Sequence, residues 1–432
     1  MARFLVATVP VIGHVGPAVP IVHKLIERGH DVRWYTGSAF RSIVETAGAF
    51  FTPMATAFDY SDLTKISTEL TNERNSLRGI AQLKFDVKHF FIDSAPAQVA
   101  DCLDLLEKTP ADVLLVDPLF IGASWLHEKG GPPWAEYGVS VLMHKSWDAP
   151  PFGLGLTPGP PVIGRLRNRI LHWVAKQMMF RELSIHTDQL RSNIGLPKDP
   201  KGIFDIRCPF LHIAGTVPSF EYPRRDLPPQ VHFVGPLLPE SPTRFTPPAW
   251  WGEMDGEKRV VLVTQGTVAT EQPDLIKPAL IALGDEDMLI VVTTGGKQAI
   301  EMEPLPTNAR VEPFLPYAAL LPQVDAMVTN GGYGGVQFAL AHGVPLVVAG
   351  NSEDKADVCA RVEWAKVGIN LKTKTPTPQQ ISAAVKKVLI DPAYRANARA
   401  IQAEMAQYDG PNMAVDLLER LARIGKPILR IS

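Results

Sequence analysis

Residues 325–351 read DAMVTNGGYGGVQFALAHGVPLVVAGN, and this stretch decides the fold. A short apolar strand is predicted over 325–329, and four glycines follow within the five positions 331–335. A helix over 334–342 and a second buried strand over 344–348 complete the stretch. A strand, a helix and a strand in this order form the repeating unit of a parallel α/β sheet with helices on both faces.

The glycines at this junction also predict an anion-binding site. Glycine lets a backbone approach a ligand closely, and a helix N-terminus offers unpaired N–H groups and a partial positive charge. The usual biological anion in such a place is a phosphate or a diphosphate. The segment is not a P-loop, because no Gly-Lys-Ser/Thr follows, and it is not a G-x-G-x-x-G dinucleotide fingerprint. Glycines in a tight α/β turn can also be purely steric.

The length of 432 residues favours two domains over one. Alternating strand and helix patterns start near the N-terminus, with strands over 4–9, 31–35 and 112–116, and restart at about 259. We therefore expect doubly wound, Rossmann-like α/β domains. The expected division is 1–217 for the first domain, 218–257 for a proline-rich linker, 258–410 for the second domain and 411–432 for a final helical segment.

Composition excludes several classes of protein. The net charge is −2 and 46% of the residues are apolar, so bulk charge predicts no nucleic-acid partner. Three widely spaced cysteines argue against a disulfide framework and fit a reducing cytoplasm, which is the expected location. Residues 4–22 contain no Lys, Arg, Asp or Glu, but Pro10, Pro17 and Pro20 would break a membrane span or signal helix. We expect no stable membrane insertion.

Residues 165–181 form a basic stretch with apolar side chains at helical spacing. A basic amphipathic helix can lie on a membrane, so peripheral contact stays open. The favoured interpretation is a helix that packs its apolar side on the core and exposes its charged side.

Two residues of the first half predict an acid–base pair. His14 is expected in a turn over 13–16 after the first strand, and Asp117 directly follows the strand over 112–116. In the common strand order 3-2-1-4 these two strands are neighbours, so the two side chains would meet above the sheet. A carboxylate that is hydrogen-bonded to a histidine fixes the tautomer of the ring and stabilises the imidazolium form. The histidine of such a pair can therefore act as a general base. Each residue alone has a plain structural explanation.

Three loops of the second half should gather at the same sheet edge. Thr267 follows a strand and offers a hydroxyl to phosphate, while the aromatic at Phe314 could stack on a nucleobase. Asp354 can accept hydrogen bonds from hydroxyls, and Lys355 can donate to a hydroxyl or a phosphate. An Asp–Lys pair before a helix can also be a simple cap. The acidic stretch 285–287 lies at the opposite edge, so we expect no metal site.

Together these motifs resemble those of the nucleotide-sugar-dependent family 1 glycosyltransferases, which include plant secondary-metabolite glucosyltransferases and bacterial macrolide glycosyltransferases. The resemblance covers the whole chain and is strongest over 314–355. It implies the GT-B fold, in which two Rossmann-like domains face each other across a cleft and the last helix, here 411–432, returns to the first domain. It also implies an acceptor-binding first domain and a donor-binding second domain.

By the same resemblance, His14 is the base that deprotonates an acceptor hydroxyl, and Asp117 is its partner. Phe314 falls where the family often has a base-stacking tryptophan. Asp354 and Lys355 fall at the pair that holds the sugar hydroxyls. The remaining donor contacts implied by the motif are Thr267, Leu315, Asn330, Gly331, Gly332, Gly334, Gly335 and Gln337.

Three positions depart from the family pattern. Asn330 stands where a histidine usually touches the diphosphate, and its amide can still donate a hydrogen bond. Phe338 replaces the glutamate that grips the ribose, with Gln337 as a substitute. Lys355 replaces a glutamine. These changes leave the donor open between UDP-glucose, the default, and another UDP-sugar or a dTDP-sugar.

The sequence thus predicts an inverting, metal-independent transferase that moves a hexose from a nucleotide diphosphate sugar to a hydroxyl of a hydrophobic small molecule, such as a phenol, polyketide, sterol or lipid. No cofactor beyond the donor is expected. Phe85, Phe90 and Trp147 are candidate acceptor contacts. A sugar-nucleotide epimerase of GT-B fold and a catalytically silent nucleotide-sugar-binding protein are the alternatives.

Overall fold

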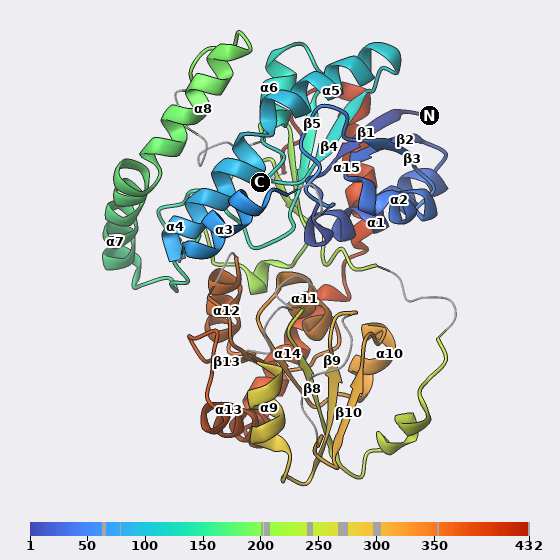
Figure 1. Cartoon of the computed structure of the whole chain (residues 1–432), viewed down its shortest axis with the longest axis vertical. Helices are drawn as coiled ribbons and strands as arrows, with labels where there is room; N and C mark the ends of the chain where they lie inside the picture. The colour runs from blue at the N-terminus through green and yellow to red at the C-terminus, as the bar shows by residue number, and fades with distance from the viewer. Residues whose placement is uncertain are drawn as a thin grey trace.

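The computed structural model describes residues 1–62, 66–77, 79–199, 202, 208–239, 245–266, 275–296, 304–351 and 354–430. The chain folds into two lobes, each built on a parallel sheet with helices on both sides (Figure 1). The doubly wound α/β class predicted from the sequence is confirmed.

The first lobe contains a seven-stranded sheet in the order β3-β2-β1-β4-β5-β6-β7, with every pair parallel. The pairing of β1 with β4 confirms the neighbouring strands that the sequence predicts. The last strand falls inside the segment 218–257 and pairs with β6. The strands are β1 (Arg3–Ala7), β2 (Asp31–Thr36), β3 (Phe50–Pro53), β4 (Val113–Val116), β5 (Trp134–Tyr137), β6 (Leu211–Ala214) and β7 (Val231–Phe233).

Helices cover both faces of this sheet, and most of them contribute apolar side chains to two core clusters with it. The helices are α1 (Ile12–Glu27), α2 (Arg41–Thr46), α3 (Thr68–Ser76), α4 (Gly79–Asp86), α5 (Ala95–Lys108), α6 (Gly122–Glu128), α7 (Pro161–Val174) and α8 (Arg181–Asn193). Two π-helical segments, η3 (Val87–Ile92) and η4 (Ala175–Met179), continue α4 and α7.

The second lobe contains a six-stranded parallel sheet in the order β10-β9-β8-β11-β12-β13. Its strands are β8 (Arg259–Thr264), β9 (Met288–Thr293), β10 (Ala309–Glu312), β11 (Ala326–Thr329), β12 (Leu346–Val348) and β13 (Gly368–Asn370). Its helices are α9 (Ile276–Leu283), α10 (Tyr317–Leu320), α11 (Tyr333–Ala341), α12 (Lys355–Trp364), α13 (Pro378–Ile390) and α14 (Pro392–Met405). The stretch over 325–351 therefore folds as predicted, into β11, α11 and β12.

The turn predicted over 13–16 is wrong. Helix α1 already begins at Ile12, so His14 lies in its first turn. Pro17 and Pro20 lie inside this helix, where each removes a backbone donor and crowds the carbonyl four residues earlier. Both of those earlier positions are glycines, whose backbone has the freedom to relieve the crowding. A helix can therefore form where the prolines and glycines predict a turn.

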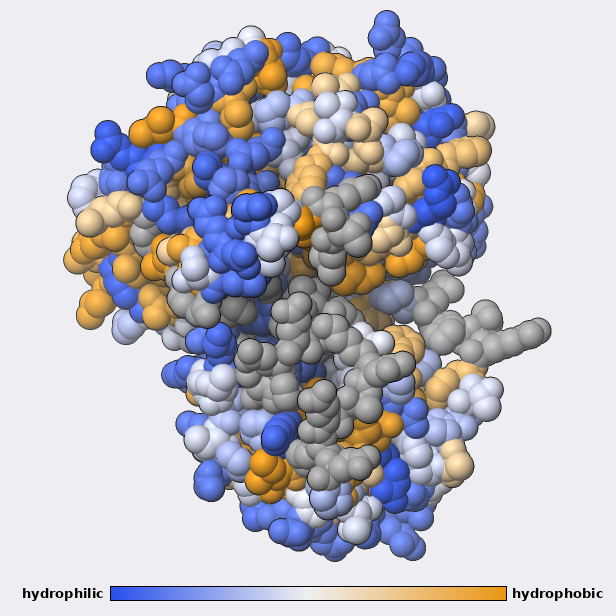
Figure 2. All heavy atoms as spheres, in the orientation of Figure 1, coloured by the Kyte–Doolittle hydropathy of each residue, from blue (hydrophilic) through white to orange (hydrophobic). Residues whose placement is uncertain are grey.

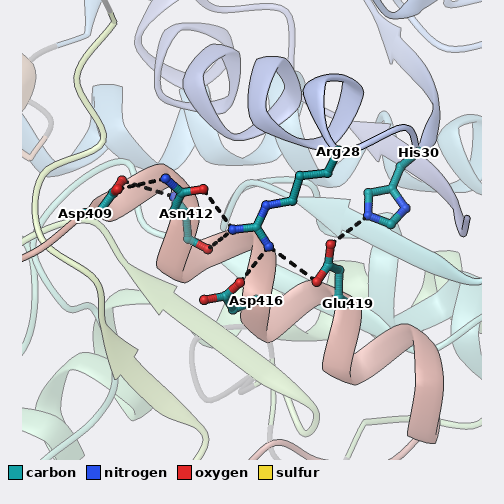
Figure 3. Close-up of polar contacts among 6 residues, drawn as sticks. All are labelled: Arg28, His30, Asp409, Asn412, Asp416 and Glu419. Carbon is teal, nitrogen blue, oxygen red and sulfur yellow. Dashed lines mark hydrogen bonds and ion pairs between the residues drawn. The ribbon is translucent and has the colours of Figure 1, made fainter.

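The last helix, α15 (Gly410–Ile424), returns to the first lobe and packs against α1, as predicted. Figure 3 shows the polar side of this contact: Arg28 forms an ion pair with Asp416 at 2.6 Å, and His30 Nε2 lies 2.9 Å from a carboxylate oxygen of Glu419. The apolar side of α15 joins the core of the first lobe through Ala414, Val415, Leu418 and Leu421. Within the described ranges, no helix is long and apolar enough to cross a membrane.

Candidate active site

His14 and Asp117 meet above the first sheet. His14 Nδ1 lies 2.7 Å from Asp117 Oδ1, although the two residues are 103 positions apart. The pair forms because β1 and β4 are adjacent and parallel, which places the residues beyond their carboxyl ends side by side. Since Nδ1 is held by the carboxylate, Nε2 is the nitrogen that can take a proton from a substrate.

The chain holds Asp117 in place through further hydrogen bonds. Its Oδ2 accepts from the backbone N–H of Val9 at 2.8 Å, and its Oδ1 accepts from the backbone N–H of Leu119 at 2.9 Å. The carboxylate is fully buried, while the His14 side chain is 14% exposed. The Tyr137 hydroxyl donates to the backbone carbonyl of His14 at 2.6 Å. The histidine is therefore fixed by its side chain and its backbone and keeps one accessible edge.

One position of the glycine-rich turn in the second lobe requires glycine for steric reasons. Gly331 has a φ of 79°, in the left-handed region that favours glycine. A Cβ there would also collide with the sulfur of Cys359 in α12. Burial raises the pKa of that thiol to about 12, so it is a packing group beneath the turn.

Gly334 differs, because nothing in the described protein requires its small size. A Cβ at this position would meet no atom within 4 Å, and its φ is not in the left-handed region. It lies in the first turn of α11, whose N-terminal N–H groups have no carbonyl partner inside the helix. The missing side chain keeps space open next to these donors, which suits an anion that approaches the backbone.

Asn330 organises this turn instead of pointing only outward. Its side-chain amide nitrogen donates to the backbone carbonyl of Gln265, and its Oδ1 accepts from the backbone N–H of Gly332 at 3.2 Å. The residue is 8% exposed. The amide predicted to contact phosphate therefore links the loop after β8 to the turn after β11. Thr267, predicted in that first loop, lies outside the described residues.

The aromatic position at the end of β10 is exposed, as a stacking platform requires. Phe314 is 69% exposed, whereas the neighbouring Leu315 is buried in the core. The Leu315 side chain is thus a packing group and is not presented to a ligand. Behind them, Tyr317 packs edge-to-face on Phe338, with 5.5 Å between the ring centroids. Phe338, at the family's ribose-glutamate position, is therefore a packing residue here.

Asp354 joins the two lobes. It immediately precedes α12, and its Oδ2 accepts a hydrogen bond from the hydroxyl of Ser140 at 2.5 Å. Ser140 follows β5 of the first sheet and Asp354 follows β12 of the second, so the carboxyl edges of the two sheets face each other. Lys355, the first residue of α12, is 7% exposed. Figure 1 shows α11 and α12 on the side of the second lobe that faces the first.

Gln337 also lies at this interface, but in a different role from the predicted one. The residue is 2% exposed, and its Nε2 donates to the hydroxyl of Thr216 at 3.2 Å. A side chain that is buried between the lobes is poorly placed to replace the ribose-binding glutamate.

The sequence reasoning missed a buried ion pair between the lobes. Arg361 of α12 lies 2.9 Å from Glu221, and both side chains are 3% exposed or less. Glu221 also accepts from the backbone N–H of Leu142 at 2.7 Å. Ser140 was missed for a related reason: the short run 134–137 that precedes it was not recognised as a strand.

Asp357 adds a further contact between the lobes. Its Oδ2 accepts from the backbone N–H of Gly153 at 2.6 Å. Burial raises the pKa of Asp357 to about 6, against the opposing effect of the nearby Arg361.

The predicted acceptor residues do not share one environment. Phe85 is buried in α4 and contacts His89, and Phe90 packs edge-to-face on Tyr60 with 5.2 Å between the centroids. Both are packing residues, as aromatics usually are. Trp147 is partly exposed and contacts His172 of α7, with 5.9 Å between the centroids.

The stretch 285–287 lies just before β9, at the amino edge of its sheet, as the sequence predicts. Among the residues that the structure describes, no group of three or more His, Cys, Asp or Glu side chains is arranged to hold a metal ion. Metal independence remains a prediction.

Two facing Rossmann-like lobes, with a glycine-rich helix N-terminus in one and a His–Asp pair in the other, define the architecture of a GT-B glycosyltransferase. Residues 277–421 match the model of the erythromycin biosynthesis protein CIII-like C-terminal domain. The chain is 48% identical over 422 residues to 4'-demethylrebeccamycin synthase from Lentzea aerocolonigenes, covering 97% of this chain and 99% of that protein. It is 33% identical to UDP-glucosyltransferase A1 from Starmerella bombicola, covering 97% and 92%.

Comparison with solved structures gives the same fold. The crystal structure of the glycotransferase of kitacinnamycin superposes with a TM-score of 0.74 at 23% identity and covers 99% of both chains. The chain belongs to the family 1 glycosyltransferases of GT-B fold. It is a glycosyltransferase of the natural-product type that uses nucleotide sugars.

Proposed function

We propose that this protein is an inverting glycosyltransferase that moves a hexose, glucose by default, from a UDP-sugar to a hydroxyl of a hydrophobic small molecule. The observation that carries the proposal is the 2.7 Å contact between His14 Nδ1 and Asp117 at the carboxyl edge of the first sheet, which faces the glycine-rich turn of the second. The UDP-glucose default is supported by relatives named UDP-glucosyltransferases.

In this mechanism, His14 Nε2 takes the proton of the acceptor hydroxyl, and the oxygen attacks the anomeric carbon. The bond from that carbon to the diphosphate breaks on the opposite face, which inverts the configuration. Negative charge grows on the departing diphosphate, and the N-terminus of α11 stabilises it through its free N–H groups and partial positive charge. Asp117 stabilises the imidazolium that forms on His14. No step requires a metal ion.

The test combines His14→Ala with a matched control, His23→Ala, on the exposed side of the same helix. A general base contributes about 10²–10⁴-fold in rate, so His14→Ala should lose that factor in kcat, and His23→Ala should not. Both variants should bind UDP equally well by calorimetry. Near-normal turnover of His14→Ala on a hydroxyl acceptor would show that the base assignment is wrong.

The substrate panel separates the remaining possibilities. UDP-glucose, other UDP-sugars and dTDP-sugars are each incubated with phenols, sterols, macrolides and heteroaromatic N–H compounds, and products are read by mass spectrometry. The proposal expects transfer to a hydroxyl from a UDP-sugar. Conversion of the donor without any acceptor would identify an epimerase, and binding without transfer or hydrolysis would identify a silent binding protein.

A further inference from the structure

Helix α7 exposes the apolar side that the sequence interpretation assigned to the core, so that interpretation is wrong. Exposed fractions along this side run from 55% at Ile170 to 83% at Val162. The apolar surface continues through Met178 of η4 to Ile185 of α8. Its members on α7 are Val162, Ile163, Leu166, Ile170 and Trp173, and we call this set the α7 stripe. Figure 2 shows hydrophobic residues gathered at the edge of the first lobe where Figure 1 places α7.

The stripe lies on the opposite side of α7 from the one that packs on the protein. The buried residues of the helix are Gly164 and Asn168. Successive residues of an α-helix are about 100° apart around its axis, which places Gly164 and Asn168 on the side opposite the centre of the stripe. The packed side is attached by polar bonds: the Asn168 amide donates to the carbonyl of Trp147 at 3.1 Å, and His172 Nε2 lies 3.0 Å from the carbonyl of Ser146. The stripe is therefore not used to hold α7 in the fold.

Basic side chains border the stripe. No Asp or Glu occurs over 149–181, whereas five Lys or Arg residues do. At the same helical spacing, Arg165, Arg169 and Lys176 fall along one edge of the stripe and Arg167 along the other. Arg169 and Lys176 are exposed.

These basic groups make only local contacts within the described protein. Arg165 lies 3.5 Å from Asp148, Arg167 donates to the carbonyl of Thr157 at 2.8 Å, and Arg169 lies over the Trp147 ring at 5.6 Å. The positive charge is thus concentrated next to the apolar side chains.

An exposed apolar stripe that includes a tryptophan, next to a basic edge, is the composition of a helix that lies in a membrane interface. We propose that α7 and η4 form a docking surface for an anionic lipid membrane, with the α7 stripe among the acyl chains and the basic edge on the headgroups. Charge complementarity favours anionic headgroups over neutral ones, since each Lys or Arg near the surface adds attraction. The proposal depends only on this surface and not on which acceptor is glycosylated.

The experiment is co-sedimentation of the full chain with phosphatidylcholine vesicles, with and without phosphatidylglycerol, together with the tryptophan emission of wild type compared with that of Trp173→Phe, because the chain has eight tryptophans. Wild type should bind only the vesicles that contain phosphatidylglycerol, with a blue shift of the emission. The double variant Arg169→Glu/Lys176→Glu should weaken the partition coefficient by roughly 25-fold or more, since each basic group contributes about fivefold. The triple variant Leu166→Ser/Ile170→Ser/Trp173→Ser should abolish binding.

The matched control is Ile281→Ser/Ile390→Ser, which changes exposed apolar residues of the second lobe and should leave vesicle binding unchanged. All variants should keep the wild-type unfolding temperature, because the changed side chains are exposed. Equal binding to neutral vesicles, or no binding to anionic ones, would overturn the proposal. It would also be overturned if the stripe variants converted a dimer to a monomer in light scattering, because the occupant would then be a second copy of the chain.

Discussion

Ser140 Oγ donates a hydrogen bond to Asp354 Oδ2 at 2.5 Å, and this bond connects the carboxyl edge of one sheet to that of the other. The family resemblance assigns Asp354 to the sugar hydroxyls of the donor. In the described structure the carboxylate also has a partner, Ser140, in the first lobe. The two lobes are therefore linked at the position where the transferred sugar is expected to lie.

Substitutions at these two positions should have different effects on the kinetics. Asp354→Ala removes an acceptor of sugar hydroxyl bonds, so we expect KM for the donor to rise by roughly tenfold, equivalent to one or two hydrogen bonds. Ser140→Ala removes only the contact between the lobes and should leave the donor KM within about threefold. Steady-state kinetics at saturating acceptor measures both values. Equal effects of the two changes would show that Asp354 only links the lobes.

Gly334→Ala should separate stability from donor binding. Alanine is the better helix former by up to about 1 kcal/mol, and a Cβ at this position meets no protein atom within 4 Å, so the variant should unfold at the same or a higher temperature. The new methyl group would occupy the space next to the N-terminus of α11, so donor affinity should fall by at least about tenfold.

The control for this change is Gly252→Ala, which lies outside the glycine-rich turn and whose Cβ would likewise meet no atom within 4 Å. It should leave the affinity for UDP unchanged. Calorimetric titration with UDP measures both variants. Unaltered UDP affinity in Gly334→Ala would place the diphosphate elsewhere.

Asp117→Asn should reduce kcat and leave donor binding intact. An amide offers one acceptor oxygen where the carboxylate offers two, so it cannot serve Val9, Leu119 and His14 in the same way, and it does not stabilise an imidazolium. We expect a loss of about 10²–10⁴-fold in kcat. Asp112→Asn, just before the same strand, is the control and should retain activity. A loss confined to KM for the donor would contradict the proposed role.

Asp357→Asn should alter how stability depends on pH. The folded-state pKa of Asp357 is raised to about 6 by burial, from an ordinary value of 3.8. Between these two values the folded chain binds more protons than the unfolded chain, so stability falls as pH rises through this window. Asparagine does not titrate and can still accept the bond from Gly153.

The difference in unfolding free energy between Asp357→Asn and wild type should therefore grow in favour of the variant by about 1 kcal/mol from about pH 5 to about pH 7.5. Denaturant unfolding at several pH values measures it. A difference that stays constant over this range would show that burial does not shift this carboxyl group.

Local sequence patterns were sufficient to predict the helices and strands whose own residues are distinctive. The run 325–351 carries a strand, a glycine turn and a helix within itself, and these formed as β11, α11 and β12. Segments with weak or conflicting patterns were predicted wrongly or not at all. The prolines and glycines near the start of α1 hid its first turn, and the four-residue strand β5 includes Glu136 and is not an apolar run. The apolar side of α7 predicted burial, because periodicity reports which side is apolar and not what lies next to it.

The sequence by itself determined the parallel α/β class, the glycine-rich helix start and the pairing of His14 with Asp117, because each of these depends on short segments and on a common strand order. Only the tertiary structure decided which candidates are presented to a ligand and which are packed. Leu315 and Gln337 are buried, Phe314 is exposed, and Asn330 binds its own chain. Burial and cross-lobe contacts depend on segments far apart in sequence, and no local pattern encodes which of them come together.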